Sequence, residues 1–245
     1  MTPGVQLEIC DVRDAALEAL PGELPQGELH LWKRSLDPSA PAVEACSALL
    51  SPEEREKAQR YRIERPRTDF ILTRGTLRSL LAGYLRRKPE EFSFQYTAQG
   101  KPFLADHPDL HFNVSHSDGL ALLAFVRGRE IGIDVERVRT QSDVLKLAER
   151  FFSTRERHDL RNLSGDELHA AFFRCWTRKE AYIKAKGDGL SLPLHEFDVS
   201  IAPNQTRALL ATRPDASEAK RWAISDVAVP SGYAAALAVE QEAAE

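Results

Sequence analysis

The stretch LALLAFVRGREIGIDVE, residues 120–136, lies near the middle of this 245-residue chain and holds two predicted β-strands. Leu120 to Val126 is a continuous apolar run, whereas Ile131 to Glu136 alternates apolar residues with a glycine and two carboxylates. Between them, Arg127 to Glu130 is predicted to form a hairpin turn. This turn organises the fold, because the sequence on its two sides follows one pattern.

The repeated pattern is a helix, a proline, a short strand, and then a glycine followed by a longer apolar strand. Before the turn it reads Pro89, FSFQY, and Gly119 with LALLAFV; after the turn it reads Pro193, FDVSI, and Gly232 with YAAALAV. Corresponding positions lie a little over a hundred residues apart. The repeat predicts an α+β protein made of two similar halves that pack as a pseudo-dimer. We place the N-terminal half at residues 1–128 and the C-terminal half at residues 129–245.

Helix starts are predicted at three serines, each followed three residues later by a glutamate that can complete a capping box: Ser51, Ser153 and Ser164. Thr68 to Arg87 is a further predicted helix, because apolar residues recur at helical spacing before Pro89 ends it. Short apolar or alternating segments predict further strands at Glu28–Arg34, Phe92–Tyr96, His111–Ser115, Phe197–Ile201, Trp222–Val227 and Tyr233–Val239.

The composition is that of an ordinary globular protein and narrows the range of functions. Hydrophobic residues make up 42% of the chain, and the net charge of −4 with a pI near 6.0 argues against a nucleic-acid or anionic-membrane partner. The N-terminus lacks the segments of a signal peptide, and the longest apolar run is far too short to span a bilayer. Three cysteines without a C-x-x-C pair indicate neither a disulfide framework nor a zinc site. We therefore expect a soluble protein of the reducing cytoplasm.

Asp134 and Glu136 are the first candidate functional residues. Side chains two apart on a strand share a face and stand about 6 to 7 Å apart, so both carboxylates can reach one cation. Like charges at this spacing repel each other unless a cation or water lies between them, and Mg²⁺ is the usual ion where phosphates supply other ligands. Gly132 leaves room on the same face. A half-exposed edge strand whose polar face meets water explains the same residues, and the pattern alone leaves both interpretations open.

A second group of candidates lies on AFFRCWTRKEAYIKAKGDG, a predicted helix that begins at Ala171. Its aromatic and aliphatic residues form one side, whereas Thr177, Glu180 and Lys184 share another face at i, i+3 and i+7. A carboxylate and an ammonium on one face suit a functional site. A surface ion pair between Glu180 and Lys184, worth about 0.2–0.5 kcal/mol, is the alternative.

Four motifs, taken together and in order, resemble those of a known enzyme family. They are GKP at 100–102, FNVSHS at 112–117, IGIDVE at 131–136 and WTRKEAYIK at 176–184. The chain closely resembles the 4'-phosphopantetheinyl transferases of the surfactin-synthetase-activating type, from about Ser51 to Val239. The resemblance implies a pseudo-dimer of two α/β halves, each with a small, mostly antiparallel sheet packed on a helix, and an active site between the halves.

The resemblance also implies an activity. Enzymes of this family transfer the 4'-phosphopantetheine arm of coenzyme A to a serine hydroxyl of an apo acyl, peptidyl or aryl carrier protein and release adenosine 3',5'-bisphosphate. The implied cofactor is Mg²⁺, with Mn²⁺ as an alternative, and coenzyme A is the substrate. A monomer is expected, because one chain contains both halves. Fatty-acid, polyketide and nonribosomal-peptide pathways all use such carriers, and the sequence does not name the one used here.

By resemblance, the metal ligands are Asp134, Glu136 and Glu180. Glu180 also matches the general base that takes the serine proton. Lys184 matches a lysine that contacts the phosphates of coenzyme A and stabilises the leaving phosphate. Lys179 is expected to contribute to the same positive field.

Four further residues match positions that contact coenzyme A in the relatives. Together with Lys184, the predicted coenzyme contacts are Lys57, Lys101, Ser115 and His116. His116 is expected at the 3'-phosphate, with Ser115 beside the phosphates and Lys101 in the adenine and phosphate pocket. Glu54 departs from the pattern, because a relative has lysine there. The sequence leaves open which cation replaces it.

Two other functions fit parts of this pattern. A metal-dependent phosphohydrolase or nuclease uses a comparable pair of carboxylates, but it releases phosphate products without any carrier, and the acidic chain disfavours a nucleic-acid substrate. An inactive partner that binds coenzyme A and carrier proteins needs no catalytic residues. The presence of Asp134, Glu136 and Glu180 speaks against that alternative.

Overall fold

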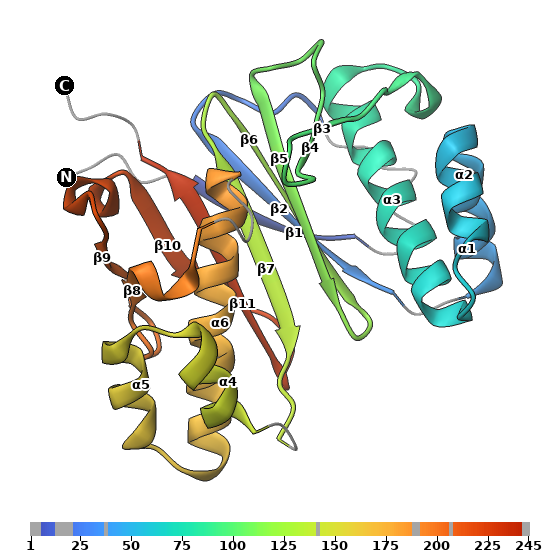
Figure 1. The fold of residues 1–245 in the computed structure, drawn as a ribbon. Coiled ribbons are helices and arrows are strands. Elements are labelled where there is room, and N and C mark those ends of the chain that lie inside the picture. The colour runs from blue at the N-terminus through green and yellow to red at the C-terminus, as the bar shows by residue number, and fades with distance from the viewer. Residues whose placement is uncertain are drawn as a thin grey trace.

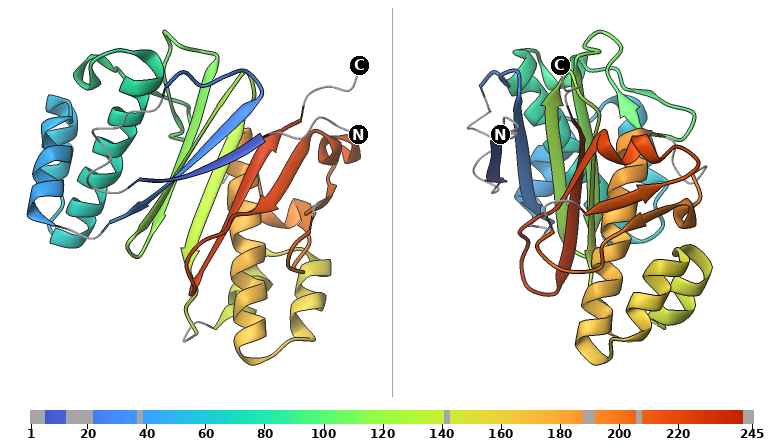
Figure 2. Two further views of the ribbon diagram at one scale, coloured as in Figure 1. Left: turned by 180° about the vertical axis from the view of Figure 1, so that it is seen from behind. Right: turned by 90° about the vertical axis from the view of Figure 1, so that its left-hand side faces the viewer.

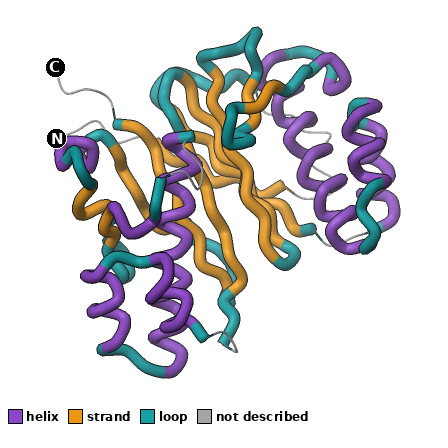
Figure 3. Tube along the Cα trace, in the orientation of Figure 1, coloured by secondary structure: helices purple, strands orange, loops and turns teal. Residues whose placement is uncertain are grey.

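Two β-sheets lie against each other in the middle of the molecule, and helices cover the outer side of each sheet (Figures 1 and 3). The structure, a computed structural model, describes residues 6–12, 22–36, 39–140, 143–187, 192–205 and 208–241. The view from behind shows the same order of helices, sheet, sheet and helices (Figure 2). No helix within these ranges is long and apolar enough to cross a membrane.

The N-terminal half contains a four-stranded sheet and the helices that cover it. Its elements are β1 (Gln6–Val12), β2 (Glu28–Ser35), α1 (Ala40–Ala48), α2 (Pro52–Gln59), α3 (Glu64–Leu85), β3 (Gln95–Tyr96), β4 (Pro102–Phe103), β5 (Leu110–Ser117) and β6 (Leu120–Arg127). The strand order is β1-β2-β6-β5, with β1 parallel to β2 and the other pairs antiparallel. β3 and β4 form a separate small hairpin.

The C-terminal half repeats this arrangement. Its elements are β7 (Ile131–Arg137), α4 (Val144–Phe151), α5 (Thr154–Arg161), α6 (Gly165–Lys186), β8 (Phe197–Val199), β9 (Leu209–Thr212), β10 (Trp222–Asp226) and β11 (Tyr233–Glu240). The strand order is β10-β11-β7, antiparallel throughout. After the additional strand β1, the N-terminal half has the same order as the C-terminal half: a strand, two short helices, a 22-residue helix, a small strand pair and two longer strands. The prediction of a pseudo-dimer of two similar halves is therefore confirmed.

Strand alternation divides the hydrophobic core into layers. On β6, the odd-numbered residues from Ala121 to Phe125 pack toward the N-terminal helices, and the even-numbered residues from Leu120 to Val126 pack between the two sheets. The odd-numbered apolar residues of β7, from Ile131 to Val135, enter that same middle layer. The alternate residues of β7, Asp134 and Glu136, consequently face α6.

α6 packs directly against β7 at Gly132. A Cβ atom there would lie 2.1 Å from the Ala181 carbonyl oxygen and 2.3 Å from the Ala185 backbone nitrogen. The room that the sequence predicts at Gly132 is therefore filled by helix backbone. This contact sets the distance between α6 and the strand that carries Asp134 and Glu136.

Gly132→Ala is expected to lower the free energy of unfolding by about 2–3 kcal/mol, because the added methyl forces the α6 backbone away from β7. Urea unfolding measures the change. Gly22→Ala is the matched control, since Gly22 is exposed and no atom lies within 4 Å of the added carbon. That variant should stay within about 0.5 kcal/mol of the wild type. A Gly132→Ala protein as stable as the control would contradict the close contact.

Most predicted elements lie near their predicted bounds. The capping boxes at Ser51 and Ser153 are confirmed, whereas Ser164 precedes α6 without a side-chain cap hydrogen bond. The helix predicted from Thr68 begins earlier, at Glu64. The strand predicted at Phe92–Tyr96 is reduced to its last two residues, because the chain leaves a 3₁₀ turn at Phe92 and buries that side chain in the core.

The hairpin predicted at Arg127 to Glu130 is wrong, because β6 and β7 belong to different sheets. β7 pairs with β11 along one edge, and its other edge lies beside β5. Three β5 side chains accept backbone N–H groups of β7 there, at 2.9, 3.3 and 3.1 Å: Asn113 from Ile133, Ser115 from Val135 and Ser117 from Arg137. We call Asn113, Ser115 and Ser117 the seam, since these side chains join the two halves.

Candidate active site

β7 and α6 bring the two groups of candidate residues together. Asp134 is buried on the α6 side of β7, with 4% of its surface exposed. Lys184, one turn beyond Glu180 on α6, donates from Nζ to Asp134 Oδ1 at 2.6 Å and to Ser115 Oγ at 3.2 Å. Asp134 and Lys184 are 50 residues apart in the sequence, so this contact brings the strand motif and the helix motif together in space.

The hydroxyls of the seam hold both carboxylates of β7. Ser115 Oγ donates to Asp134 Oδ1 at 2.9 Å while it accepts hydrogen bonds from the Val135 N–H and from Lys184. One donated and two accepted bonds use the full capacity of a hydroxyl. Ser117 Oγ repeats the contact on Glu136, donating to Oε2 at 2.8 Å. Side chains of the N-terminal half thus position acidic groups of the C-terminal half.

Burial disfavours the negative charges of this cluster. It raises the pKa of Asp134, although the charge of Lys184 opposes the shift. Burial also raises the pKa of Glu136, against the Ser117 hydrogen bond and together with the charge of Asp134. For Glu180, burial and then the charge of Asp134 raise the pKa to about 7. A carboxyl group with this pKa can accept and release a proton near neutral pH.

The raised pKa of Glu180 predicts a pH-dependent stability. Its folded-state pKa of about 7 lies above the ordinary value of 4.5, so its contribution to stability is present below pH 4.5 and is lost as the pH rises through 7. In chelator, the unfolding free energy of the wild type should therefore fall relative to that of Glu180→Gln between these pH values. Urea unfolding at a series of pH values measures the difference. Parallel curves for the two proteins would contradict the shift.

His116 extends the site toward α3. The surrounding protein lowers the pKa of this exposed histidine, the Asp69 carboxylate opposes that shift, and Lys184 adds to it. Asp69 in turn pairs with Arg65 at 3.0 Å. Arg65 Nη2 also lies 3.0 Å from where a Cβ atom on Gly119 would stand, at the β5–β6 turn. Sequence reasoning missed Arg65, because it is one of eleven Lys and Arg residues between 51 and 88.

Two of the predicted coenzyme contacts lie apart from this cluster. Lys101 Nζ donates to Glu130 Oε2 at 2.7 Å and to the Ala185 carbonyl at 3.0 Å, at the C-terminal end of α6. Lys57 is exposed on α2, with Nζ 5.2 Å from the centre of the Phe70 ring. The structure thus gathers Ser115, His116 and Lys184 near the carboxylates, but places these two lysines elsewhere.

Two further motif residues have structural partners. Glu54 completes the cap at Ser51 and pairs with Arg78 at 2.6 Å in a buried position, which explains an acidic residue at this place. Lys179 is fully buried and pairs with Glu156 at 2.8 Å. The expectation that Lys179 joins the phosphate field is therefore wrong, because its ammonium points into the protein interior.

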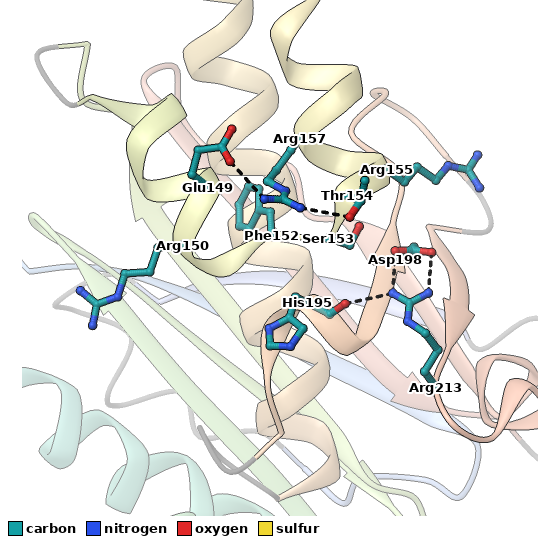
Figure 4. A pocket seen from close by; sticks show the side chains of 10 residues that line it. All are labelled: Glu149, Arg150, Phe152, Ser153, Thr154, Arg155, Arg157, His195, Asp198 and Arg213. Carbon is teal, nitrogen blue, oxygen red and sulfur yellow. Dashed lines mark hydrogen bonds and ion pairs between the residues drawn. The ribbon is translucent and has the colours of Figure 1, made fainter.

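A pocket of about 440 Å³ lies beside the ends of α4 and α5 (Figure 4). Much of its charge is paired within the pocket, with Arg157 on Glu149 and Arg213 on Asp198. Its lining consists of Glu149, Arg150, Phe152, Ser153, Thr154, Arg155, Arg157, His195, Asp198 and Arg213. None of the predicted site residues is among them, so this pocket is not the site that the sequence predicts.

One carboxylate oxygen of the cluster is completely buried and has no hydrogen-bond partner among the described residues. Asp134 Oδ2 is buried and makes no hydrogen bond, although buried polar atoms are normally paired. Within the described ranges, no three His, Cys, Asp or Glu side chains form a group that can hold a metal ion as they stand. The ammonium of Lys184 supplies the positive charge beside Asp134 instead. The donor chemistry nevertheless fits a hard cation, because carboxylates with raised pKa values gain from an added positive charge.

Comparisons with known proteins point to one family. The family model described as "4'-phosphopantetheinyl transferase superfamily" matches residues 130–238, and "4'-phosphopantetheinyl transferase, N-terminal" matches residues 34–127. The chain is 40% identical over 215 residues to 4'-phosphopantetheinyl transferase HetI of Nostoc sp., covering 86% of this chain and 87% of the relative. It is 37% identical over 154 residues to 4'-phosphopantetheinyl transferase Sfp of Bacillus subtilis, covering 63% and 67%. A solved holo-(acyl-carrier-protein) synthase from Bacillus anthracis in complex with CoA (3',5'-ADP) matches 46% of this chain and 96% of its own, at 23% identity and a TM-score of 0.37.

Proposed function

The chain belongs to the 4'-phosphopantetheinyl transferase family, and from this membership we propose how it acts. It transfers the 4'-phosphopantetheine arm of coenzyme A to a serine hydroxyl of an apo acyl, peptidyl or aryl carrier protein and releases adenosine 3',5'-bisphosphate. The observation that carries the proposal is the meeting of the β7 and α6 motifs, where Lys184 lies 2.6 Å from Asp134.

Glu180 and Lys184 have separate roles in the proposed reaction. Without a cation, burial and the neighbouring carboxylates raise the pKa of Glu180 to about 7. In the proposed step, Glu180 takes the proton of the carrier serine as the serine oxygen bonds to the phosphorus of the arm. The bond from that phosphorus to the bridging oxygen of the adenosine bisphosphate breaks in the same step. Lys184, with 30% of its side chain exposed, stabilises the charge that develops on the leaving phosphate.

We assign Mg²⁺ to the carboxylates of Asp134, Glu136 and Glu180, with Mn²⁺ as the alternative ion. The unpaired, buried Oδ2 of Asp134 and the raised pKa values of all three carboxyl groups support a cation at this place. When bound, the ion neutralises the carboxylates and withdraws charge from the pyrophosphate.

Coenzyme A is the proposed substrate, with its phosphates beside Ser115, His116 and Lys184. For Ser115 this requires one of the three hydrogen bonds of its hydroxyl to open. Arg65 of α3, whose guanidinium reaches the β5–β6 turn, is our candidate for the cation expected near Glu54. Lys57 and Lys101 stay proposed contacts for the outer part of the coenzyme. For Lys101 this requires its ion pair with Glu130 to open.

Mass spectrometry of carrier proteins tests the proposed function. The chain, coenzyme A and Mg²⁺ are incubated with apo carriers from fatty-acid, polyketide and nonribosomal-peptide pathways. A gain of the mass of the phosphopantetheine arm at the carrier serine is expected for at least one of them, and the same carrier with serine replaced by alanine should gain nothing. Absence of the added mass on every carrier would overturn the proposal.

The same assay separates the alternative functions. A metal-dependent phosphohydrolase would release phosphate products from coenzyme A when no carrier is present. An inactive binding partner would bind coenzyme A and carriers without any mass gain. Neither alternative requires Glu180 to face a serine hydroxyl, whereas the transferase does.

We further propose that the active site lies between halves divided at residues 128 and 129. The spacing of the two family matches, which end at 127 and begin at 130, supports this division. A monomer is proposed because one chain contains both halves, and light scattering after gel filtration tests it. Cys46 and Cys175 are buried and form no disulfide among the described residues, which suits the reducing cytoplasm, our proposed location.

A further inference from the structure

All three residues of the seam accept a hydrogen bond from a backbone N–H of β7, but only two of them also donate a hydrogen bond to a side chain of β7. Ser115 accepts a hydrogen bond from the Val135 N–H and donates one to the Asp134 carboxylate. Ser117 likewise accepts from the Arg137 N–H and donates to the Glu136 carboxylate, so each serine bonds a carboxylate one residue before the N–H. Asn113 accepts the N–H of Ile133, but the preceding residue there is Gly132, which has no side chain. A hydroxyl can do both tasks at once because it has one proton and two lone pairs.

We infer that Ser117 is a positioning residue of the transferase, which fixes the carboxylate of Glu136 toward the cation site from the opposite half of the molecule. The contact is direct, at 2.8 Å from Ser117 Oγ to Glu136 Oε2, and Ser117 is only 8% exposed. A glutamate side chain held by a buried hydroxyl loses less rotational freedom when it meets a ligand. The inference rests on the proposed function, because it takes Glu136 to be a metal ligand.

Asn113 supplies the comparison that separates positioning from mere support. Loss of Asn113 or of Ser117 each leaves one β7 N–H without its side-chain acceptor, so both changes weaken the seam. Only loss of Ser117 also frees a carboxylate. A purely structural role for Ser117 therefore predicts similar effects of the two changes on cation binding.

The test measures Mn²⁺ binding by the full-length chain, from the electron paramagnetic resonance signal of the free ion, with and without coenzyme A. Ser117→Ala is expected to weaken Mn²⁺ binding about tenfold, as loss of a group that orients a metal ligand usually does. Asn113→Ala should change it less than about threefold, and Ser117→Thr, which keeps the hydroxyl, should stay within about threefold of the wild type.

A double-mutant cycle with Glu136→Ala makes the test independent of the Asn113 control. If Ser117 acts through Glu136, adding Ser117→Ala to Glu136→Ala should weaken Mn²⁺ binding by less than about twofold more. Hydrogen exchange checks that Ser117→Ala has lost its backbone contact, since the Arg137 amide should lose protection. Should Asn113→Ala fail to fold, the cycle alone decides.

Two results would overturn the inference. One is Mn²⁺ affinity of Ser117→Ala equal to that of the wild type, and the other is the same tenfold loss in the Glu136→Ala background. A wild-type chain that modifies carriers but binds no Mn²⁺ would also overturn it, while the proposed function would stand. If no carrier is modified but Mn²⁺ binding and the double-mutant cycle give the expected results, the proposed function is overturned and the positioning role of Ser117 stands.

Discussion

Glu180→Gln is expected to lower kcat/KM for carrier modification by about 10³-fold, without loss of stability. Glutamine keeps the size of the side chain but cannot take the serine proton, and loss of a general base typically costs about 10²- to 10⁴-fold in rate. The same change removes a buried charge that Asp134 and Glu136 repel, so the free energy of unfolding should stay equal or rise near neutral pH. A loss of turnover without a loss of stability rules out unfolding as the cause.

Rates of carrier modification and urea unfolding, measured on the same preparations, give the two quantities. Glu167→Gln is the matched control, because it makes the same change at an exposed residue in the first turn of α6. It should leave both quantities near the wild type. Turnover of Glu180→Gln within about tenfold of the wild type would remove Glu180 from the proposed role. Asp134→Ala should share the loss of turnover but also lose stability, because Lys184 loses its partner.

Lys179→Met is expected to lower the free energy of unfolding by about 3–5 kcal/mol, the usual effect of removing one partner from a buried ion pair. Lys179 Nζ donates to Glu156 Oε1 at 2.8 Å and to the carbonyl groups of Leu194 and Phe197 at 2.6 and 2.7 Å. Methionine fills the space but leaves the Glu156 carboxylate buried without a counter-charge. The pair links α6 to the start of α5 and to β8, so its loss loosens the support of the catalytic helix.

Urea unfolding of Lys179→Met measures this effect, and the double variant Lys179→Met/Glu156→Gln is the control. Removing the stranded charge as well should recover part of the stability. A loss below about 1 kcal/mol for Lys179→Met would show that the pair does not hold the C-terminal half together.

The repeat and the motifs predict the fold because they depend on local rules. Capping boxes at Ser51 and Ser153 and the alternation along β7 are set by neighbours in sequence. The path of the chain after Arg127 is set by pairing between β7 and β11, which are about a hundred residues apart, so the turn itself carries no sign of it. A short linker between strands looks the same whether or not the strands pair.

For the site, the sequence identifies which residues gather but not which way neighbouring side chains turn. Glu180 and Lys179 are adjacent in α6, yet one faces Asp134 and the other the buried Glu156. Ser117 carries no chemical motif of its own, and its contact with Glu136 depends on how two separate sheets lie side by side. Packing between distant elements decides such contacts, and one sequence does not show it.

The seam also bears on how this protein behaves when it is heated or diluted from denaturant. Unpaired N–H groups along a strand edge recruit strands from other molecules. Asn113, Ser115 and Ser117 cover three such groups on β7 with side chains alone, so within the described part of the chain the contact between the halves keeps that edge closed. Wherever the halves come apart before either unfolds, this edge of β7 is released. Self-association into aggregates is then the expected fate of the chain.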